Sequence, residues 1–370
     1  MKENRIYKKL GEVCDVKTGK LDANASDENG LYPFFTCSKE PLRINTYSYD
    51  SECILVAGNG DLNVKYYNGK FDAYQRTYII TLKNGITDIY VRYLYCFFLL
   101  YVETLRKKSI GGVIKYIKLG DITEAKVYIP SLSTQSRIVS ELDLLQSIID
   151  KQQTQLKELN TLAQAVFYDM FGDPVENEKG WEVKKLGECC VSVSYGTSAP
   201  SSSQGKFIYL RMNNITYGGE LDLTDVKYID LEPTDFEKYS IKEGDILFNR
   251  TNSAELVGKT TWFHKLEPMV IAGYIIRVRL NETLLPVYVS IFLNTKEMKL
   301  MLKAMGKGAV NQANINSKEL QGISIPVPPL PLQQSFAAKI ESIEKQKAAI
   351  SKSIAETKKL YDYTMDKYFG

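Results

Sequence analysis

The sequence predicts an α+β protein that is an internal pseudo-twofold repeat: two similar mixed α/β globular domains separated by two long helices that form an antiparallel coiled coil. Three observations support this. One set of short motifs occurs twice in the same order, each copy contains β-branched runs between Gly and Asn turns, and each copy ends in a long stretch without Gly or Pro. The expected boundaries are 1–130 (first domain), 131–172 (first helix), 173–180 (linker), 181–328 (second domain) and 329–370 (second helix).

The repeat is visible at both ends of each copy. Lys8–Glu12 (KKLGE) recurs as Lys184–Glu188, an offset of 176. Further along, the offset becomes 198 and aligns Tyr90 with Tyr288, Ile117 with Ile315, Pro130 with Pro328, Gln135 with Gln333, and Phe171-Gly172 with Phe369-Gly370. The second copy is therefore about 22 residues longer, the difference between the two offsets, and the extra length lies upstream of Pro286.

Composition narrows the possible functions. The chain has 370 residues, a net charge of only +3 and a single histidine, His264, which argues against His-triad catalysis and histidine-based zinc sites. Its six cysteines form no CxxC pair, and no signal peptide is present. We therefore expect a reduced, cytosolic chain.

Local patterns predict the elements of each domain. Thr77–Leu82 and Ile275–Leu280 have the β-branched and aromatic enrichment of strands. Ile89–Val102 is the longest apolar run, but it is shorter than the roughly 20 residues of a membrane span and contains Arg92. We expect a buried helix of a water-soluble domain there, and a membrane segment is the lesser alternative.

The two long helices are the clearest prediction. Gln135–Met170 and Gln333–Phe369 contain no Gly or Pro, and each follows a proline-containing stretch that separates it from its domain. A heptad pattern over about five heptads predicts a packed seam, interrupted by Gln152 and Lys347. These two could set the register, or the lysine could simply extend its amine to solvent. The predicted interface residues are Ile138, Leu142, Leu145, Ile149, Leu156, Leu159, Phe336, Ile340, Ile343, Ile350, Ile354 and Tyr361.

Two similar domains at the ends of a helical rod suit DNA, whose half-sites recur on one face about every 34 Å, although such a rod could also span a protein dimer. Polar loops in each domain offer groups that pair with bases and phosphates, and ordinary surface turns are the alternative. The residues predicted to bind DNA are Lys17, Thr18, Lys20, Asn59, Gln75, Arg76, Lys115, Tyr195, Thr197, Arg211, Asn213, Asn214, Arg250, Thr251, Asn252, Ser253, Lys259, Lys307, Asn311, Gln312 and Asn314.

Several short strings of this sequence resemble the DNA specificity subunits of type I restriction-modification systems. They are Gly244–Ser253 (GDILFNRTNS), Leu256–Lys259 (LVGK), Gln312–Asn316 (QANIN) leading into Ile325–Leu330 and Gln333, Trp181–Glu188 (WEVKKLGE), and the Phe-Gly that ends each helix. The resemblance covers essentially the whole chain. The first domain is the more divergent copy, because it lacks the FNRTNS string and has Ser131–Gln135 where the second copy is richer in proline.

The resemblance implies a non-catalytic subunit. It would bind a bipartite sequence in double-stranded DNA, one half-site per target recognition domain, with the two helices as a ruler. The same helices would dock two modification (adenine methyltransferase) subunits, and ATP-dependent restriction subunits would join them. It implies no cofactor on this chain, since S-adenosylmethionine and ATP/Mg would be bound by the partners, and it implies the cytoplasm of a bacterium or archaeon, without membrane contact. The half-site sequences and the spacer length do not follow from it.

The sequence agrees with the absence of chemistry. It contains no Asn/Asp-Pro-Pro-Tyr string and no GxxxxGK[ST] loop, and Ala57–Asp61 lacks the GxGxxG pattern and is expected to be a turn. Asp173, Glu176 and Glu178 lie in the linker without a strand to hold a metal site. A stand-alone nuclease or methyltransferase, and a coiled-coil scaffold without affinity for DNA, are the alternatives.

Overall fold

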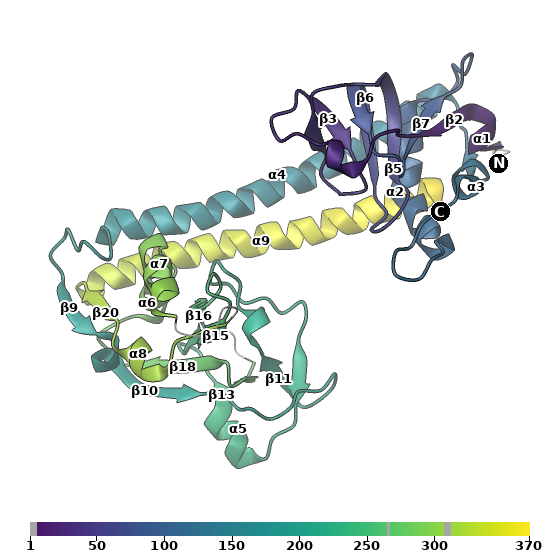
Figure 1. Ribbon diagram of the computed structural model, residues 1–370. Helices are drawn as coiled ribbons and strands as arrows, with labels where there is room; N and C mark the ends of the chain where they lie inside the picture. The colour runs from purple at the N-terminus through teal and green to yellow at the C-terminus, as the bar shows by residue number, and fades with distance from the viewer. Residues whose placement is uncertain (1–5, 265–266, 307–311) are drawn as a thin grey trace. The chain divides into compact units, whose positions relative to one another are not determined.

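The computed structural model describes residues 6–264, 267–306 and 312–370. It divides into two compact units: unit 1 comprises residues 1–153 and 352–370, and unit 2 comprises residues 154–351. Each unit contains one globular domain and a part of both long helices (Figure 1). The division falls inside the helices, whereas the boundaries expected from the sequence separate each domain from its helix. The boundaries expected from the sequence therefore stay a prediction, which concerns the parts of the chain that fold independently.

Unit 1 is built on one mixed sheet with the strand order β2-β7-β5-β6-β3-β4. Its strands are β2 (Cys14–Thr18), β3 (Tyr32–Phe35), β4 (Leu42–Ile44), β5 (Tyr49–Ala57), β6 (Val64–Ala73) and β7 (Thr77–Leu82). All neighbours are antiparallel except β3 and β6, which run parallel. The strand predicted at 77–82 is thus confirmed as β7.

Helix α2 (Val91–Lys108) forms the core of unit 1 with this sheet. Its buried side chains, including Tyr93, Leu94 and Phe98, pack in one cluster with Ile54 and Ile80 of the sheet. The predicted buried helix is therefore confirmed. No helix within the described ranges is both long and apolar enough to cross a membrane.

Smaller elements complete unit 1. They are β1 (Tyr7–Lys9), α1 (Leu10–Val13), the 3-10 turn η1 (Ala23–Ala25), α3 (Leu119–Thr123) and β8 (Lys126–Tyr128). Strands β1 and β8 pair antiparallel, so the start of the chain is joined to the segment that leads into the first long helix.

Unit 2 has two four-stranded sheets, ordered β10-β18-β14-β16 and β12-β11-β17-β13, and two short pairs, β9-β20 and β15-β19. The strands are β9 (Glu182–Lys185), β10 (Cys190–Tyr195), β11 (Phe207–Leu210), β12 (Lys227–Ile229), β13 (Ser240–Ile241), β14 (Ile246–Asn249), β15 (Thr251–Asn252), β16 (Thr260–Trp262), β17 (Met269–Ile271), β18 (Ile275–Leu280), β19 (Ala313–Asn314) and β20 (Ser324–Val327). The helical elements are η2 (Leu186–Cys189), η3 (Met212–Asn214), α5 (Pro233–Tyr239), α6 (Pro286–Leu293), α7 (Lys296–Met305) and α8 (Ser317–Gln321).

The two units share one topology, which confirms the predicted internal repeat. The run β2-β7-β5-β6 corresponds to β10-β18-β14-β16. The parallel pairing of β3 with the end of β6 corresponds to that of β11 with β17, so the single strand β6 is represented in unit 2 by β16 and β17. Helix α5 and strand β13 lie within the longer stretch that the second copy has before Pro286.

The structure corrects one alignment of the repeat. A buried glutamine at the start of each long helix accepts a backbone hydrogen bond, from Tyr90 to Gln135 Oε1 (3.0 Å) and from Leu285 to Gln333 Oε1 (2.8 Å). Tyr90 is therefore the equivalent of Leu285. The equivalent of Tyr288 is Tyr93, and both tyrosine hydroxyls donate to a carbonyl of the strand that precedes the long helix. The expected match of Tyr90 with Tyr288 was wrong by three residues because a shared Tyr-Val pair suggested it.

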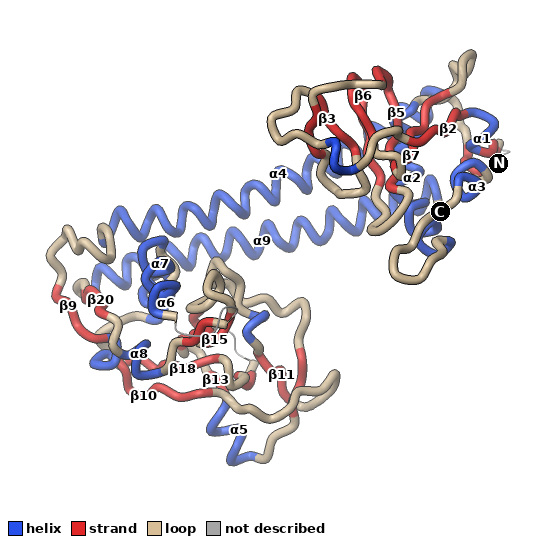
Figure 2. Tube along the Cα trace, in the orientation of Figure 1, coloured by secondary structure: helices blue, strands red, loops and turns tan. Residues whose placement is uncertain are grey.

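The long helices are α4 (Leu132–Phe171) and α9 (Leu330–Phe369), of 40 residues each, and Figure 2 shows both as unbroken helices. In unit 1 the start of α4 packs on the end of α9: Gln152 Nε2 donates to Ser353 Oγ (2.6 Å) and the Tyr368 hydroxyl donates to Glu141 (3.0 Å). In unit 2 the end of α4 packs on the start of α9, where the Phe171 and Phe336 rings lie 5.1 Å apart. The helices are thus antiparallel within each unit, as predicted.

All twelve predicted interface residues are buried or half-buried, as the predicted seam requires. Phe167, Phe171 and Met365 are also buried but were not predicted. An α-helix drifts by about 20° per heptad against a strict seven-residue repeat, so neighbouring positions turn inward toward the helix ends.

Candidate DNA interface

Four segments that are distant in the sequence meet at one edge of the sheet in unit 1. We call residues 17–20, 58–60, 75–76 and 115–117 the domain 1 cluster. Backbone hydrogen bonds hold it together: Gly58 donates to Arg76 (2.8 Å), Ile117 donates to Gly58 (3.0 Å), and Gly60 donates to Lys115 (2.9 Å). The cluster depends on no particular side chain for these bonds, so its side chains are available for a ligand.

A cavity of about 280 Å³ opens within the domain 1 cluster. Thr18, Gln75 and Arg76, three of the predicted DNA-binding residues, line it. The other four of unit 1 lie on the same segments: Lys17, Lys20 and Lys115 are exposed, and Asn59 is half-buried. The structure thus brings all seven predicted residues of unit 1 to one place.

Unit 2 contains the same arrangement, which we call the domain 2 cluster: residues 195–197, 250–253, 273–274 and 312–315. Arg250 donates its amide to Tyr274 (2.9 Å), Ile315 donates to Arg250 (2.9 Å), and Thr251 pairs with Asn314 across β15 and β19. These bonds repeat those of Gly58, Ile117 and Asn59 in unit 1.

One glycine in each cluster permits the close approach of two chain segments. A Cβ atom on Gly19 would lie 2.1 Å from the carbonyl oxygen of Ala73, and one on Gly196 would lie 2.2 Å from that of Ile271. Both contacts are with backbone, which cannot rotate away. Glycine is therefore required at the end of β2 and at the end of β10.

Side chains in the domain 2 cluster contact one another and their neighbours. The guanidinium of Arg250 lies over the Tyr195 ring, 4.7 Å from its centroid, and the Tyr195 hydroxyl bonds Ser317 Oγ (2.9 Å). The Thr251 hydroxyl donates to Asn314 Oδ1 (2.9 Å). The predicted residues gathered here are Tyr195, Arg250, Thr251, Asn252, Ser253, Gln312 and Asn314. Lys307 and Asn311 lie outside the described residues.

Three predicted DNA contacts are wrong, because their side chains are buried and used internally. Asn214 is 2% exposed; its amide donates to the carbonyls of Asp222 and Asp225 and its oxygen accepts from the Arg211 amide. Lys259 is 6% exposed and donates to the Met212 carbonyl (2.7 Å), and burial lowers its pKa.

Thr197 is the third. It is buried, and its hydroxyl accepts from the Ala199 amide (3.1 Å). Arg211 is occupied by an ion pair with Asp225 (3.0 Å), while Asn213 is exposed outside the domain 2 cluster. Nothing in the local sequence of these polar loops indicates which side chains face inward.

The sequence criterion also missed tyrosines. Tyr116 lies in the domain 1 cluster and lines its cavity, and Tyr274 lies in the domain 2 cluster; both rings are partly exposed. Aromatic faces can stack on nucleic-acid bases or carry cations. Tyr195, which precedes Gly196 at the end of β10, was predicted, so a tyrosine beside Gly or Lys near a strand end was a usable signal for Tyr116 and Tyr274 as well.

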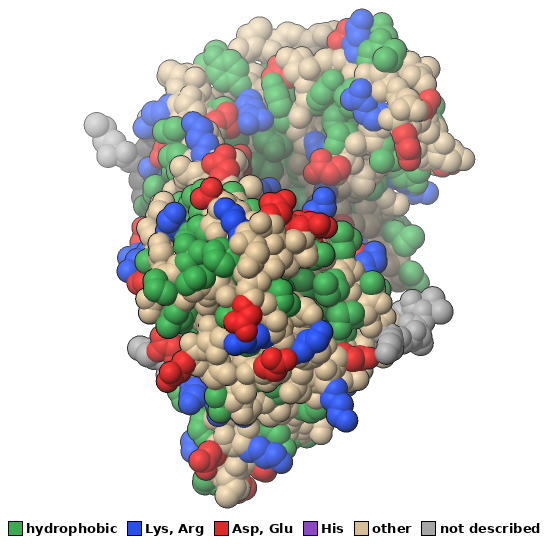
Figure 3. All heavy atoms as spheres, turned by 90° about the vertical axis from the view of Figure 1, so that its left-hand side faces the viewer, with side chains coloured by type: hydrophobic (Ala, Val, Ile, Leu, Met, Phe, Trp, Pro, Cys, Tyr) green, Lys and Arg blue, Asp and Glu red, His purple; other side chains and the backbone are tan. Residues whose placement is uncertain are grey.

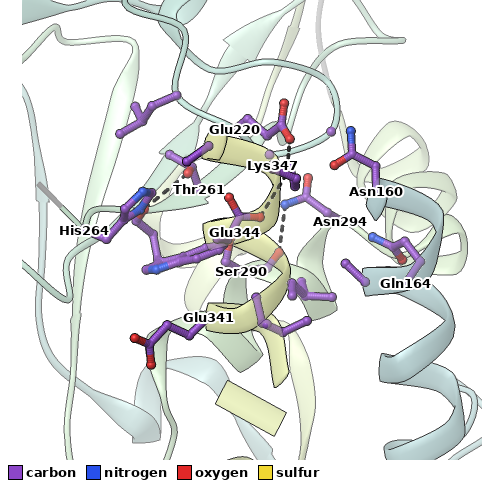
Figure 4. Close-up of a pocket in the computed structure, with 18 of the residues that line it drawn as sticks. Asn160, Gln164, Glu220, Thr261, His264, Ser290, Asn294, Glu341, Glu344 and Lys347 are labelled. Atoms are coloured by element: carbon purple, nitrogen blue, oxygen red, sulfur yellow. Dashed lines mark hydrogen bonds and ion pairs between the residues drawn. The ribbon is translucent and has the colours of Figure 1, made fainter. Parts of the chain in front are cut away.

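A larger cavity of about 650 Å³ lies elsewhere in unit 2 (Figure 4). Lys347 of α9 points into it and pairs with Glu344 (2.9 Å) and with Glu220. Burial alone would lower the pKa of Lys347, but the bonds to the two glutamates raise it above its ordinary value. The lysine that interrupts the heptad seam therefore anchors the 216–221 loop to α9.

This second cavity does not have the side chains of a metal centre. His264 lines it and lies near the Trp262 carbonyl (3.3 Å). Across the part of the chain that the structure describes, no group of three or more His, Cys, Asp or Glu side chains is arranged to hold a metal ion. In the linker, Asp173 accepts backbone hydrogen bonds from Val175 and Glu176.

Charge on the surface is mixed. On the face shown in Figure 3, Lys and Arg side chains alternate with Asp and Glu, as the net charge of +3 suggests. The face shown therefore carries no broad basic field.

Comparison with known proteins gives the family. The family model described as the type I restriction modification DNA specificity domain matches residues 2–161 and 178–359, so it recognises the repeat as two domains. The EcoDI type I restriction enzyme specificity subunit of Escherichia coli is 40% identical over 152 residues, which are 40% of this chain and 33% of that protein. The putative MjaX specificity subunit of Methanocaldococcus jannaschii is 29% identical over 199 residues, 52% of this chain and 46% of that protein.

The chain thus aligns with less than half the length of these two relatives. Its fold is that of a solved protein: the crystal structure of a type I restriction-modification system S subunit from M. genitalium matches with a TM-score of 0.63 over 100% of this chain and 98% of that one, at 15% identity. Since the family model covers most of both repeats, the chain belongs to the type I restriction modification DNA specificity domain family.

Proposed function

We propose that this protein is the DNA sequence-recognition subunit of a type I restriction-modification complex and that it performs no catalysis of its own. It binds a bipartite target in double-stranded DNA, with one half-site for each domain. One observation carries the proposal: the same four-segment cluster of cationic, amide, hydroxyl and aromatic side chains is built twice, once in each repeat.

The chemistry of the clusters fits the grooves of B-DNA. Arginine pairs with guanine O6 and N7, asparagine and glutamine pair with adenine, and lysine and hydroxyl groups bind phosphates. The two clusters present different side chains, so they read different half-sites. In this proposal α4 and α9 serve as the ruler that sets the spacing between the half-sites.

The partners are two modification subunits, which are adenine methyltransferases, and ATP-dependent restriction subunits. S-adenosylmethionine and ATP/Mg belong to them, and the complex works on DNA in the cytoplasm. Exposed apolar side chains on the long helices of unit 1 support protein partners: Leu144 and Ile148 on α4, and Leu360 and Tyr363 on α9. Leu144 and Tyr363 are 62% and 66% exposed. Exposure of such apolar surface to water is unfavourable, and a docked subunit would remove that cost.

A genome-wide map of methyladenine, made with and without this gene, tests the proposal. Loss of one split motif when the gene is deleted is the expected result, and it supplies both half-sites. An unchanged map in a host that expresses intact modification subunits, together with binding by the purified complex that ignores sequence, would overturn it.

The two other classes of function have distinct outcomes. Metal- or cofactor-dependent cleavage or methylation by the purified chain alone would indicate an enzyme. Absence of DNA affinity even at low salt, where phosphate contacts are strongest, would indicate a coiled-coil scaffold.

A further inference from the structure

A short hairpin projects from unit 1 next to the domain 1 cluster. Ile110 and Tyr116 exchange two backbone hydrogen bonds (3.0 and 2.8 Å), which close the hairpin. The loop needs Gly111, since its φ is +118° and a Cβ atom there would lie 2.5 Å from the Ile114 carbonyl oxygen. Lys115 and Ile117 bond the 58–60 segment, so the hairpin is fixed to the cluster.

The tip of this hairpin is apolar and uncovered. Val113 is fully exposed and Ile114 is 62% exposed. The exposure of two adjacent branched side chains to water is unfavourable, and a partner that covers them would remove this cost. The tip therefore has the properties of a contact surface.

The charge around the tip indicates the kind of partner. Between Thr104 and Gly120 the chain contains five Lys or Arg residues and no Asp or Glu. Arg106 is paired with Glu103 and Asp61. Within the described residues, Lys107, Lys108, Lys115 and Lys118 form no ion pair, so the stretch that contains the apolar tip carries four unpaired cations, which favour a polyanion.

We propose, building on the DNA-recognition function above, that Val113 and Ile114 form an apolar wedge that enters the base stack of the half-site bound by the first domain. The flanking lysines bind the phosphates on either side. Base edges in a groove present mainly hydrogen-bonding groups, whereas the faces of bases are apolar. Two side chains without donors or acceptors therefore match an opened base step better than a groove.

In sequence, the apolar pair is found in the first copy of the repeat and not at the aligned positions of the second. The 198-residue offset of the repeat places Asn311 and Gln312 where Val113 and Ile114 stand in the first copy. Amides at these positions suit hydrogen bonds to base edges. The variant Val113→Asn/Ile114→Gln therefore exchanges the wedge for the second domain's side chains without altering the glycines that form the hairpin.

Fluorescence of 2-aminopurine tests the wedge, because the base brightens when it is unstacked. The probe is a duplex carrying the split sequence from the methyladenine map, with 2-aminopurine placed in turn at each step of the first domain's half-site except the methylated adenine. It is bound by the full-length chain together with its modification subunits. We expect fluorescence to rise at one step with the native chain and to stay low with V113N/I114Q, which should also bind about tenfold to a hundredfold more weakly. Ile114→Phe should keep the rise.

Three comparisons make the result decisive. Leu31→Gln replaces another exposed apolar side chain of unit 1 outside the cluster and should change nothing. Lys115→Ala should weaken binding and reduce its salt dependence, but the 2-aminopurine fluorescence should still rise. No rise at any step with the native chain, or a rise retained by V113N/I114Q, would overturn the wedge. If sequence-specific binding persists in either case, only the wedge proposal is wrong. If the native complex does not bind DNA in a sequence-specific way, the proposed function itself is wrong.

Discussion

The two clusters differ in where their arginine comes from. Backbone hydrogen bonds make Gly58 the equivalent of Arg250, and Arg76 the equivalent of Tyr274. Unit 1 thus supplies its guanidinium from the segment between β6 and β7, while unit 2 supplies it from the segment after β14. Gly58 could not carry a side chain in this arrangement, because its Cβ would lie 2.4 Å from the Arg76 carbonyl oxygen.

Under the proposed function, this difference lets one fold read two sequences. The bonds that assemble each cluster join backbone atoms, so side chains can change without loss of the scaffold. The residues that cannot change are those that fit the scaffold itself, and they include Gly19, Gly58, Gly196 and the buried glutamines at the starts of the long helices.

The largest expected effect comes from breaking one scaffold and leaving the other. Gly19→Ala places a methyl group against two backbone carbonyls and should separate the domain 1 cluster, while Gly196→Ala should do the same to the domain 2 cluster. With Gly19→Ala, scrambling the first domain's half-site should no longer affect binding, and scrambling the other should still abolish it. Competition binding with half-scrambled duplexes measures this; equal sensitivity of both half-sites would refute it.

Next in size, Gln135→Ala and Gln333→Ala should destabilise their units to the same extent. Each amide donates to two carbonyls and accepts one backbone amide. Removing it leaves these buried groups unpaired, at a cost of about 2–4 kcal/mol. Urea unfolding measures the loss, and Gln346→Ala on the exposed face of α9 is the control. Unequal losses would mean that the two junctions are not equivalent.

The arginines should give a smaller, domain-specific effect. Arg76→Ala should relax the half-site of the first domain and Arg250→Ala that of the second, each by about 1–3 kcal/mol if the guanidinium contacts a guanine. Methyladenine maps of the two variants measure which half of the motif becomes degenerate. If both variants alter the same half of the motif, the assignment of one arginine to each half-site is wrong. Arg43→Ala, which lies outside both clusters, is the control.

The smallest effect concerns the ion pair that anchors the 216–221 loop to α9 in unit 2. Glu220→Gln should cost about 1 kcal/mol by weakening the pairing with Lys347. Because the pairing raises the pKa of Lys347, the contribution is fully present below pH 10.5, the ordinary lysine value, and is lost as the pH rises through the raised pKa. The difference between Glu220→Gln and the native chain in chemical denaturation should therefore shrink above pH 10.5.

Glu341→Gln is the matched control, because its ion pair with Lys345 is exposed and should contribute nothing measurable. A difference from the native chain that stays constant from pH 8 to pH 11.5 would show that Glu220 acts in some way other than by pairing with Lys347.

The sequence by itself determined the features that follow from a regular spacing of apolar residues or from the alignment of the two copies of the repeat. The duplication, the strands at 77–82 and 275–280, the buried helix at α2 and the seam from Ile138 to Tyr361 all follow from the spacing of apolar residues, which depends on local geometry. The predicted α+β repeat was confirmed for the same reason.

Only the tertiary structure decided which polar residues are available. Asn214 and Lys259 resemble their neighbours in composition, yet both are buried and bond carbonyls of the 211–225 loop. Arg76 and Lys115 are 39 residues apart in the chain, yet both accept hydrogen bonds from the 58–60 segment. The equivalence of Tyr93 with Tyr288 likewise rested on hydrogen bonds to strands 35 and 38 residues away. Burial and hydrogen bonding depend on segments that are remote in the sequence, and no local pattern records which of them will meet.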